Sequence, residues 1–316
     1  MYKEALDLIH NSRYILIITH INPDADTISC ALALSNYLYE NNLKHKVFNK
    51  QNDLPKNLDF LPRFDKITDQ LPKFYDLVIY VDCANKTRTA IEIDNTINSI
   101  NIDHHQSNEN FATINIVNSD KSSAAEVVYD FFDINNIQIS KNTASCLYVG
   151  IYDDSVKFST PRCDKDTFKT VSNLVNLGVE PNYIADNLNR RESLAKYRLL
   201  PLVLQSLQLY FEGKVGIIYV LPKWLEETGA SYKECEGMVN MILNIGIIKL
   251  AIFLRVSNGQ TRVSLRSKHN VDVTVIAKYF NGGGHLAAAG CNCETTDIFE
   301  AKEQILNYIK GLDGYL

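Results

Sequence analysis

Short apolar runs alternate with segments of helical periodicity through the first half of the chain. The apolar runs lie at residues 14–19 and 76–81, with shorter ones at 46–48 and 100–102, and the helical segments at 27–40, 124–135 and 141–152. Almost wholly apolar strands separated by helices are typical of a parallel sheet that is buried on both faces. The pattern therefore predicts an α/β domain built on a doubly wound parallel sheet.

The pattern changes in the second half of the chain. It is mainly helical from residue 165 to 207, and new strand-like runs follow at 211–221, 248–255 and 261–266. The last two runs are separated by Asn258 and Gly259, and an Asn-Gly pair between two strands is typical of a hairpin turn. We therefore expect a catalytic domain at residues 1–185, a helical linker at 186–208 and a smaller α/β domain at 209–316.

Acidic and imidazole side chains follow several of the predicted elements. These residues are His20, Asp24 and Asp26 after the first strand, Asp82 after the run at 76–81, Asp103, His104 and His105 after the run at 100–102, and Asp153 and Asp154 after the helix at 141–152. Open parallel sheets collect functional residues at the carboxyl ends of their strands. Carboxylate and imidazole groups bind divalent cations, and a pair of ions needs a shared carboxylate. The sequence therefore predicts a two-metal hydrolytic site.

Each of these groups also has a structural explanation when it is considered alone. Asp26 fits the N-cap of the helix that starts near Thr27, Asp82 fits a turn, and the two adjacent histidines fit an exposed pair. Coincidence is a poor explanation for four such clusters at the ends of four predicted strands or helices. We therefore favour the metal site.

A glycine run at residues 282–284 precedes His285 and the alanines at 287–289. Glycine permits a close backbone approach, and a helix that starts at the alanines would present its N-terminus to an anion. The run alone is better explained as a tight turn into a helix. His285, with Arg266 nearby in the sequence, favours phosphate binding. No Lys-Ser/Thr pair follows the glycines, so a P-loop is not expected.

Charge and cysteine usage limit the partners and the compartment. The formal net charge is -5 and there is no basic tail, whereas proteins that hold long duplexes are usually basic. The 7 cysteines include no C-x-x-C pair, and the N-terminus has no signal-peptide pattern. No apolar run is long enough to span a membrane. We expect a cytoplasmic protein that binds no membrane, and any nucleic acid that it binds is expected to be short; a homodimer is left open.

Taken together, the motifs resemble those of the DHH phosphoesterase superfamily. They are H-x-N-P-D-x-D at 20–26, Asp82, D-H-H at 103–105, G-I-x-x-D at 150–154, V-S-L-R-S at 263–267, V-D-V at 271–273 and N-G-G-G-H at 281–285, of which the last three resemble the accessory DHHA1 domain. The likeness spans nearly the whole chain in the expected order. It is strongest for the bifunctional oligoribonuclease/PAP phosphatase (nano-RNase) branch.

The resemblance implies two manganese ions, with magnesium as an alternative. One ion would be held by His20, Asp24 and Asp82, and the other by Asp26, Asp82, His104 and Asp154, so that Asp82 bridges them. It also implies that His105 faces the scissile phosphate and that Asp103 orients a neighbouring imidazole. A terminal substrate phosphate would be held by Gly283, Gly284 and His285, and Arg266 would pair with substrate phosphate or stack on a base.

The active site implied by the resemblance lies in the cleft between the two domains. Substrates that reach both the metals and the phosphate site would be oligonucleotides of about two to five units, cut to mononucleotides. The same site would convert 3′-phosphoadenosine 5′-phosphate (PAP) to AMP. The alternative activity is hydrolysis of cyclic dinucleotides or their linear products. A pyrophosphatase would not need Arg266 or the glycines, and a catalytically inactive nucleotide sensor would not need the full ligand set.

One motif departs from the family pattern. The fourth motif commonly reads Asp-Thr-Gly, whereas Asp154 is followed here by Ser155 and Val156. Valine lacks the backbone freedom of glycine, so the shape of this loop is open. Asp153 could compete for the ligand role, but the register of the motif favours Asp154.

Overall fold

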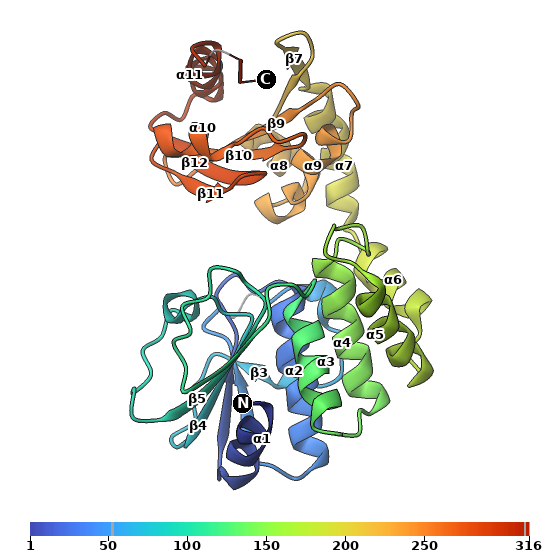
Figure 1. Cartoon of the computed structure of the whole chain (residues 1–316). Coiled ribbons are helices and arrows are strands. Elements are labelled where there is room, and N and C mark those ends of the chain that lie inside the picture. The colour runs from blue at the N-terminus through green and yellow to red at the C-terminus, as the bar shows by residue number, and fades with distance from the viewer. Residues whose placement is uncertain (52–53, 313, 316) are drawn as a thin grey trace. The chain divides into compact units, whose positions relative to one another are not determined.

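The chain folds into two compact units, Met1–Arg191 and Glu192–Leu316, in a computed structural model that describes residues 1–51, 54–312, 314 and 315. Each unit contains one sheet with its own helices (Figure 1). This is the predicted two-domain α/β class. The division lies between helix α6 (Pro181–Asn189) and helix α7 (Leu194–Gln205).

The first unit is built on six parallel strands in the order β3-β2-β1-β4-β5-β6. The strands are β1 (Ile15–Ile18), β2 (His45–Phe48), β3 (Ile67–Thr68), β4 (Leu77–Val81), β5 (Asn98–Asp103) and β6 (Ile114–Val117). The other helical elements of this unit are α1 (Tyr2–Asn11), α2 (Ala25–Glu40), η1 (Lys56–Leu58), η2 (Phe64–Lys66), η3 (Lys86–Thr89), α3 (Ala124–Ile134), α4 (Lys141–Asp154) and α5 (Lys165–Asn176). The strand order reverses between β1 and β4, as in the predicted doubly wound sheet.

Both faces of this sheet are covered, which explains the unbroken apolar runs. Ile15 and Ile17 of β1 belong to a large core formed with the helices, including α2, α3 and α4. Leu16 and Ile18 point to the other face, where they pack with Tyr80 of β4 and with side chains from connecting segments. Every residue of β1 and β4 is therefore buried.

The second unit contains a mixed sheet in the order β11-β12-β10-β9-β8-β7. Its elements are α7, β7 (Gln208–Tyr210), β8 (Val215–Val220), α8 (Pro222–Thr228), η4 (Tyr232–Cys235), α9 (Met238–Leu243), β9 (Leu250–Ser257), β10 (Gln260–Ser267), α10 (Thr274–Tyr279), β11 (Gly283–His285), β12 (Ala288–Cys293) and α11 (Ile298–Lys310). Strands β9 and β10 form the predicted hairpin, with φ of 52° at Asn258 and 75° at Gly259. Two positive φ values in succession match a turn that favours this pair.

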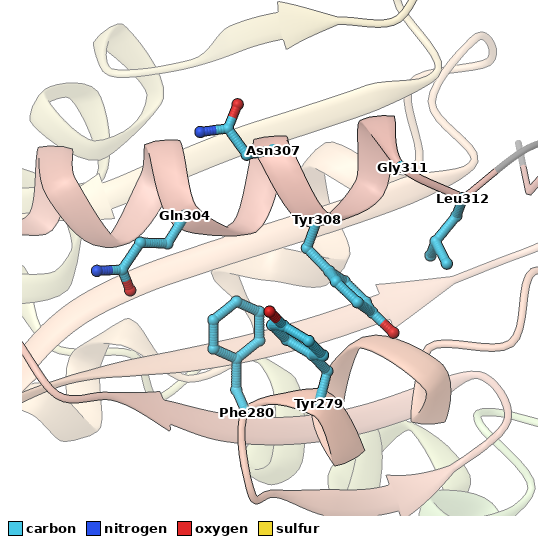
Figure 2. Close-up of a pocket in the computed structure, with 7 residues that line it drawn as sticks. All are labelled: Tyr279, Phe280, Gln304, Asn307, Tyr308, Gly311 and Leu312. Carbon is cyan, nitrogen blue, oxygen red and sulfur yellow. The ribbon is translucent and has the colours of Figure 1, made fainter.

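Helices cover the two faces of the second sheet unequally. Helices α10 and α11 pack on one face against residues of β8, β9, β10 and β12. On the other face, α7, α8 and α9 form a buried cluster whose strand residues come from β8 and β9. A hollow of about 570 Å³ between α10 and α11 is lined by Tyr279, Phe280, Gln304, Asn307, Tyr308, Gly311 and Leu312 (Figure 2). This hollow therefore lies on the side of the sheet that carries α10 and α11.

The helix expected at residues 287–289 is wrong. These residues lead into β12, which pairs antiparallel with both β10 and β11. Ala289, Cys291 and Cys293 are buried, whereas the residues between them are not, and this alternation is that of a strand with one face in the core. The glycine run therefore does not stand at a helix N-terminus.

The described part of the chain has no helix with the length and apolar character that crossing a membrane requires. All 7 cysteines are free thiols.

Candidate two-metal site

The carboxyl ends of three adjacent parallel strands bring the predicted ligands together. His20 lies just past β1, Asp82 directly follows β4, and His104 directly follows β5. Strands β1 and β4 flank the point where the strand order reverses, which is where open α/β sheets bind ligands. Asp82 has a φ of 56°, an unfavourable backbone conformation for a residue other than glycine, and such strain is concentrated at functional sites.

The ligand atoms form three overlapping groups. His20, Asp24 and Asp82 form one, Asp26, His104 and Asp154 another, and Asp82, His104 and His105 the third, with all ligand atoms in each group within 4.8 Å of one another. Asp82 belongs to two of the groups: its Oδ2 lies 3.4 Å from His20 Nε2, and its Oδ1 lies 3.7 Å from His104 Nε2. His104 Nε2 also lies 3.4 Å from Asp154 Oδ2. All six predicted metal ligands therefore surround one small volume.

Main-chain carbonyl groups orient the imidazoles of His20 and His104. His20 Nδ1 lies 2.8 Å from the carbonyl oxygen of Ile21, and His104 Nδ1 lies 3.4 Å from that of Lys121. Each Nδ1 can donate to the carbonyl, so Nε2, the atom that faces the carboxylates, is the nitrogen left to bind a cation. This arrangement is typical of histidines that bind metals.

Asp26 is held by the N-terminus of a different helix. Its Oδ2 accepts a hydrogen bond of 2.7 Å from the amide of Ala124, and its Oδ1 one of 3.0 Å from the amide of Ala125, both at the start of α3. The N-cap of its own helix is Asp24, which accepts from Thr27, so the capping role considered for Asp26 belongs to Asp24. Helix N-termini stabilise anions, and the two amides set the direction of the Asp26 carboxylate.

Gly150 allows the helices around Asp26 to pack closely. A Cβ at this position of α4 would lie 2.6 Å from Ala125 Cβ and 2.6 Å from Asp26 Oδ1. Neither distance is tolerable for a side-chain carbon. The glycine four residues before Asp154 therefore keeps Asp26 in place.

His105 is oriented by a second carboxylate. Its Nδ1 lies 2.7 Å from Asp103 Oδ1, and Asn108 donates a hydrogen bond of 2.5 Å to Asp103 Oδ2. Asn108 also donates to the carbonyl oxygen of Cys83, which immediately follows Asp82. Asp103 thus contacts a neighbouring imidazole as expected, and a third of the His105 side chain is exposed.

Asn108 and Lys121 could not be singled out from the sequence. Asn108 lies in a turn rich in polar residues, and Lys121 contributes through its backbone carbonyl, which no sequence motif identifies. Both contacts depend on the folded course of the loops that follow β5 and β6.

Crowding of like charges perturbs the carboxylates. Burial and the charge of Asp82 raise the pKa of Asp26 well above its ordinary value, and the same two causes raise the pKa of Asp154 to about 7. Burial alone would lower the pKa of His20, but the carboxylates of Asp24 and Asp82, which lie 3.7 and 3.4 Å from its Nε2, raise the pKa to about 10. The hydrogen bond with Asp103 raises the pKa of His105. In the absence of cations, the site therefore retains protons.

The donor set fits divalent cations. His20 Nε2 and Asp82 Oδ1 are buried and have no hydrogen-bond partner among the described residues, although buried polar atoms are almost always paired. Both atoms face carboxylates or imidazoles of the groups above, and carboxylate oxygen with imidazole nitrogen is donor chemistry that suits manganese and zinc. A cation bound here would pair the unpaired atoms and balance the crowded negative charge.

The loop after Asp154 adopts the conformation that its sequence disfavours. Val156, Lys157 and Phe158 all have positive φ, at 49°, 60° and 63°. The turn is held by Ser155, whose Oγ accepts from the amide of Phe158, and by the packing of Phe158 against Tyr152. Val156 thus occupies a position where glycine would be unstrained. Asp153, beside the matched aspartate, is exposed, whereas Asp154 lies in the ligand group.

The predicted phosphate-binding residues lie on one face of the second sheet. Ala288 pairs with Arg266 on one side and with His285 on the other, so the three side chains point to the same face. Gly283, Gly284 and His285 are exposed, and they form β11, the edge strand of the sheet. Edge strands have amides without a neighbouring strand, which are free to bind an anion.

Two glycines of this run are required by packing and one is not. A Cβ at Gly282 would lie 2.2 Å from the carbonyl oxygen of Gly290, and a Cβ at Gly284 would lie 2.5 Å from that of Ala288. A Cβ at Gly283 would meet nothing within 4 Å. The fold therefore does not explain a glycine at position 283, and the close approach of a ligand would.

Comparisons with known proteins agree with this geometry. A profile of the DHH family, N-terminal domain, matches residues 14–151, and a profile of the DHHA1 domain matches residues 212–311. The bifunctional oligoribonuclease and PAP phosphatase NrnA of Thermus thermophilus is 27% identical over 303 residues, which are 94% of this chain and 89% of that protein. The cyclic-di-AMP phosphodiesterase PdeA of Listeria monocytogenes is 23% identical over 98% of this chain and 49% of that protein.

A solved structure shares the fold of the whole chain. The crystal structure of an exopolyphosphatase-related protein from Bacteroides fragilis matches with a TM-score of 0.90 and 25% identity over 98% of this chain and 96% of that chain. The two profiles match in the expected order, and the DHH family is metal-dependent, in agreement with the clustered ligands. The chain therefore belongs to the DHH phosphoesterase family, carries a DHHA1 domain, and is a hydrolase.

Proposed function

We propose that this hydrolase cuts short single-stranded oligonucleotides to mononucleotides and converts PAP to AMP, with two manganese ions in the site. The observation that carries the proposal is the shared position of Asp82 between two ligand groups, one with His20 and Asp24 and the other with His104. A relative named for both activities covers nearly the whole chain, which supports this choice of substrates.

The site residues have distinct roles in the proposed reaction. His20, Asp24 and Asp82 would hold one ion, and Asp26, Asp82, His104 and Asp154 the other. When bound, the two ions supply a water of lowered pKa and offset the negative charge of the phosphate. The backbone of Asp82 is held by its amide, which donates a hydrogen bond of 2.9 Å to the carbonyl oxygen of Ile102.

His105 is suited to donate a hydrogen bond to the phosphate. Asp103 accepts from its Nδ1 and raises its pKa, which favours the imidazolium form. Nε2 then carries a proton that can be donated to a phosphate oxygen. Asn108 keeps the Asp103 carboxylate in position through its hydrogen bond to Oδ2.

The second unit would bind a terminal phosphate of the substrate. The guanidinium of Arg266 and the imidazole of His285 face the same side of the sheet, and the exposed backbone of Gly283 lies on the edge strand beside them. The same substrate would be cut at the metals of the first unit. Long duplexes would gain no further contact and are not expected to be substrates.

A panel of substrates tests the proposal. Labelled dimers to pentamers, PAP and cyclic dinucleotides should be incubated with the full chain and manganese, and the products resolved. We expect mononucleotides from the short oligomers and AMP from PAP. Asp82→Ala should abolish both reactions while its circular dichroism spectrum remains that of the wild type. Undiminished activity of Asp82→Ala would exclude the shared role of this carboxylate.

A glycine substitution tests the phosphate site separately. Gly283→Ala should leave the thermal unfolding temperature unchanged because a methyl group fits there. It should raise KM for dinucleotides much more than for bis(p-nitrophenyl) phosphate, which has no terminal phosphate. His285→Ala should show the same difference. Equal changes in KM for both substrates would contradict phosphate binding at this edge.

The alternative is hydrolysis of cyclic dinucleotides or their linear products. The similarity to a cyclic-di-AMP phosphodiesterase over 98% of this chain favours it as the second candidate. In the same panel, this activity would appear as faster turnover of cyclic-di-AMP than of the linear dimers.

A further inference from the structure

One half of the second sheet leaves a polar face open. On the face opposite α10 and α11, the buried cluster with α7, α8 and α9 takes its strand residues from β8 and β9. On β10, Arg262 is exposed and Ser264 and Arg266 are half-buried, whereas Val263 and Leu265, which point the other way, are fully buried. The strands β10, β12 and β11 therefore present side chains to solvent on this face.

Cross-strand pairing arranges these side chains in three rows. The inner row is Arg266, Ala288 and His285, the middle row is Ser264, Gly290 and Gly283, and the outer row is Arg255, Arg262 and Asn292. Paired residues point to the same face, and successive rows are about 7 Å apart because they lie two residues apart along each strand. The middle row has a hydroxyl and two glycines, so nothing bulky separates the inner row from the outer one.

The outer row brings like charges together. Arg255 and Arg262 are directly paired across β9 and β10. The Arg255 guanidinium stacks 5.0 Å above the centre of the Tyr232 ring. Burial, together with the charge of Arg262, lowers the pKa of Arg255. Like charges directly opposite each other destabilise a sheet. Within the described residues, no ion pair or hydrogen bond joins Arg255, Arg262 or Arg266 to a carboxylate.

Arginine is also concentrated on this face. The second unit has four arginines, at positions 198, 255, 262 and 266, and three of them are in these rows. Arginine presents a planar set of donors that matches phosphate oxygens, and grooves lined with such cations follow the backbone of single-stranded nucleic acids. The absence of a carboxylate partner points to an anionic ligand that comes from outside the chain.

We propose that this open face is a track for a single-stranded oligonucleotide, with an outer phosphate subsite at Arg262, supported by Arg255 and Asn292. The inference rests on the proposed function, in which Arg266 and His285 of the inner row, with Gly283, hold the terminal phosphate of the shortest substrates. Arg262 lies four residues from Arg266 on β10, which places the two Cα atoms about 13 Å apart. That distance is longer than one nucleotide step, so a dinucleotide or PAP held at the inner row would not reach Arg262. The outer subsite therefore serves trinucleotides and longer strands.

Steady-state kinetics on substrates of increasing length test the track. With manganese and the full chain, Arg262→Ala should raise KM about fivefold for trimers to pentamers, the size of one exposed charge contact, and change KM for dimers and PAP less than twofold. Arg262→Lys should recover part of the loss because the charge remains. Lys310→Ala is the matched control, since it removes one exposed cation from α11 on the opposite face.

Salt dependence distinguishes a phosphate contact from a structural effect. Fluorescence anisotropy measures the Kd of a phosphorothioate trinucleotide between 50 and 200 mM salt, roughly the range in which phosphate contacts respond. The slope of log Kd against log salt should be smaller by about 0.7 in Arg262→Ala than in the wild type. An equal rise in KM for dimers and longer strands, or no rise for either, would overturn the track. If the wild type cuts no oligonucleotide, the proposed function fails, and the anisotropy slope still decides whether the track exists.

Discussion

Metal-free protein should lose stability as the pH rises, because its site retains protons. The pKa of Asp154 is raised to about 7, first by burial and then by the charge of Asp82. The folded protein therefore holds this proton more tightly than the unfolded chain. Its contribution to the free energy of unfolding is present below pH 4 and is lost as the pH rises through 7. His20, with its pKa raised to about 10, adds a contribution that is lost between about pH 6.5 and 10.

The size of the effect follows from Asp154. A pKa about 3 above its ordinary value corresponds to about 4 kcal/mol without screening. The Asp154 side chain is 35% exposed, so solvent screening reduces this to about 1–2 kcal/mol. In a unit of this size, such a change lowers the unfolding temperature by roughly 2–8 °C between pH 5 and 8. Manganese would displace the protons, so its stabilising effect should grow over the same range.

Differential scanning fluorimetry with chelator or manganese, at pH 5, 6, 7 and 8, measures both effects. The unfolding temperature should fall with pH in chelator, and the difference between the two conditions should widen. Asp154→Asn has no carboxyl group to titrate and should show a shallower fall in chelator. A metal-free unfolding temperature that stays constant or rises from pH 5 to 8 would refute the argument from crowded carboxylates.

Two substitutions test how the site is supported. Gly150→Ala should destabilise the protein by about 1–3 kcal/mol and lower kcat, because its methyl group would lie 2.6 Å from Asp26 Oδ1 and from Ala125 Cβ. Unchanged urea unfolding and unchanged kcat would show that α4 can shift without disturbing Asp26. Val156→Gly should stabilise the protein by about 0.5–1 kcal/mol, because the free energy gained by relieving the left-handed conformation exceeds the cost of glycine's greater backbone entropy in the unfolded chain. Val156 is 60% exposed, so little packing is lost. A lower unfolding temperature would contradict the strain assigned to this loop.

The sequence predicted the parallel strands and the clustering of the candidate ligands because both depend on short-range signals. Strands β1 and β4 are buried on both faces, so each appears as an unbroken apolar run. The residues that follow them lie at one edge of the sheet for topological reasons alone, which is why His20 and Asp82 could be placed together. Short strands such as β3, with 2 residues, carry no comparable pattern.

Contacts between distant segments could not be predicted in this way. The amides that hold Asp26 belong to residues 98 and 99 positions further along the chain. The alanines at 287–289 favour a helix when the sequence is considered alone, whereas the buried Ala289 and Cys291 pair with β10 instead. Tertiary pairing outweighed the intrinsic helix propensity of small residues there.

Titration of metal-free protein with manganese, followed by electron paramagnetic resonance, tests the two-metal site most directly. Two ions should bind per chain with spectra that show coupling between them, and Asp82→Asn should remove the coupling. A single bound ion, or two uncoupled ions whose spectra are the same in Asp82→Asn, would contradict a pair of cations joined by this carboxylate.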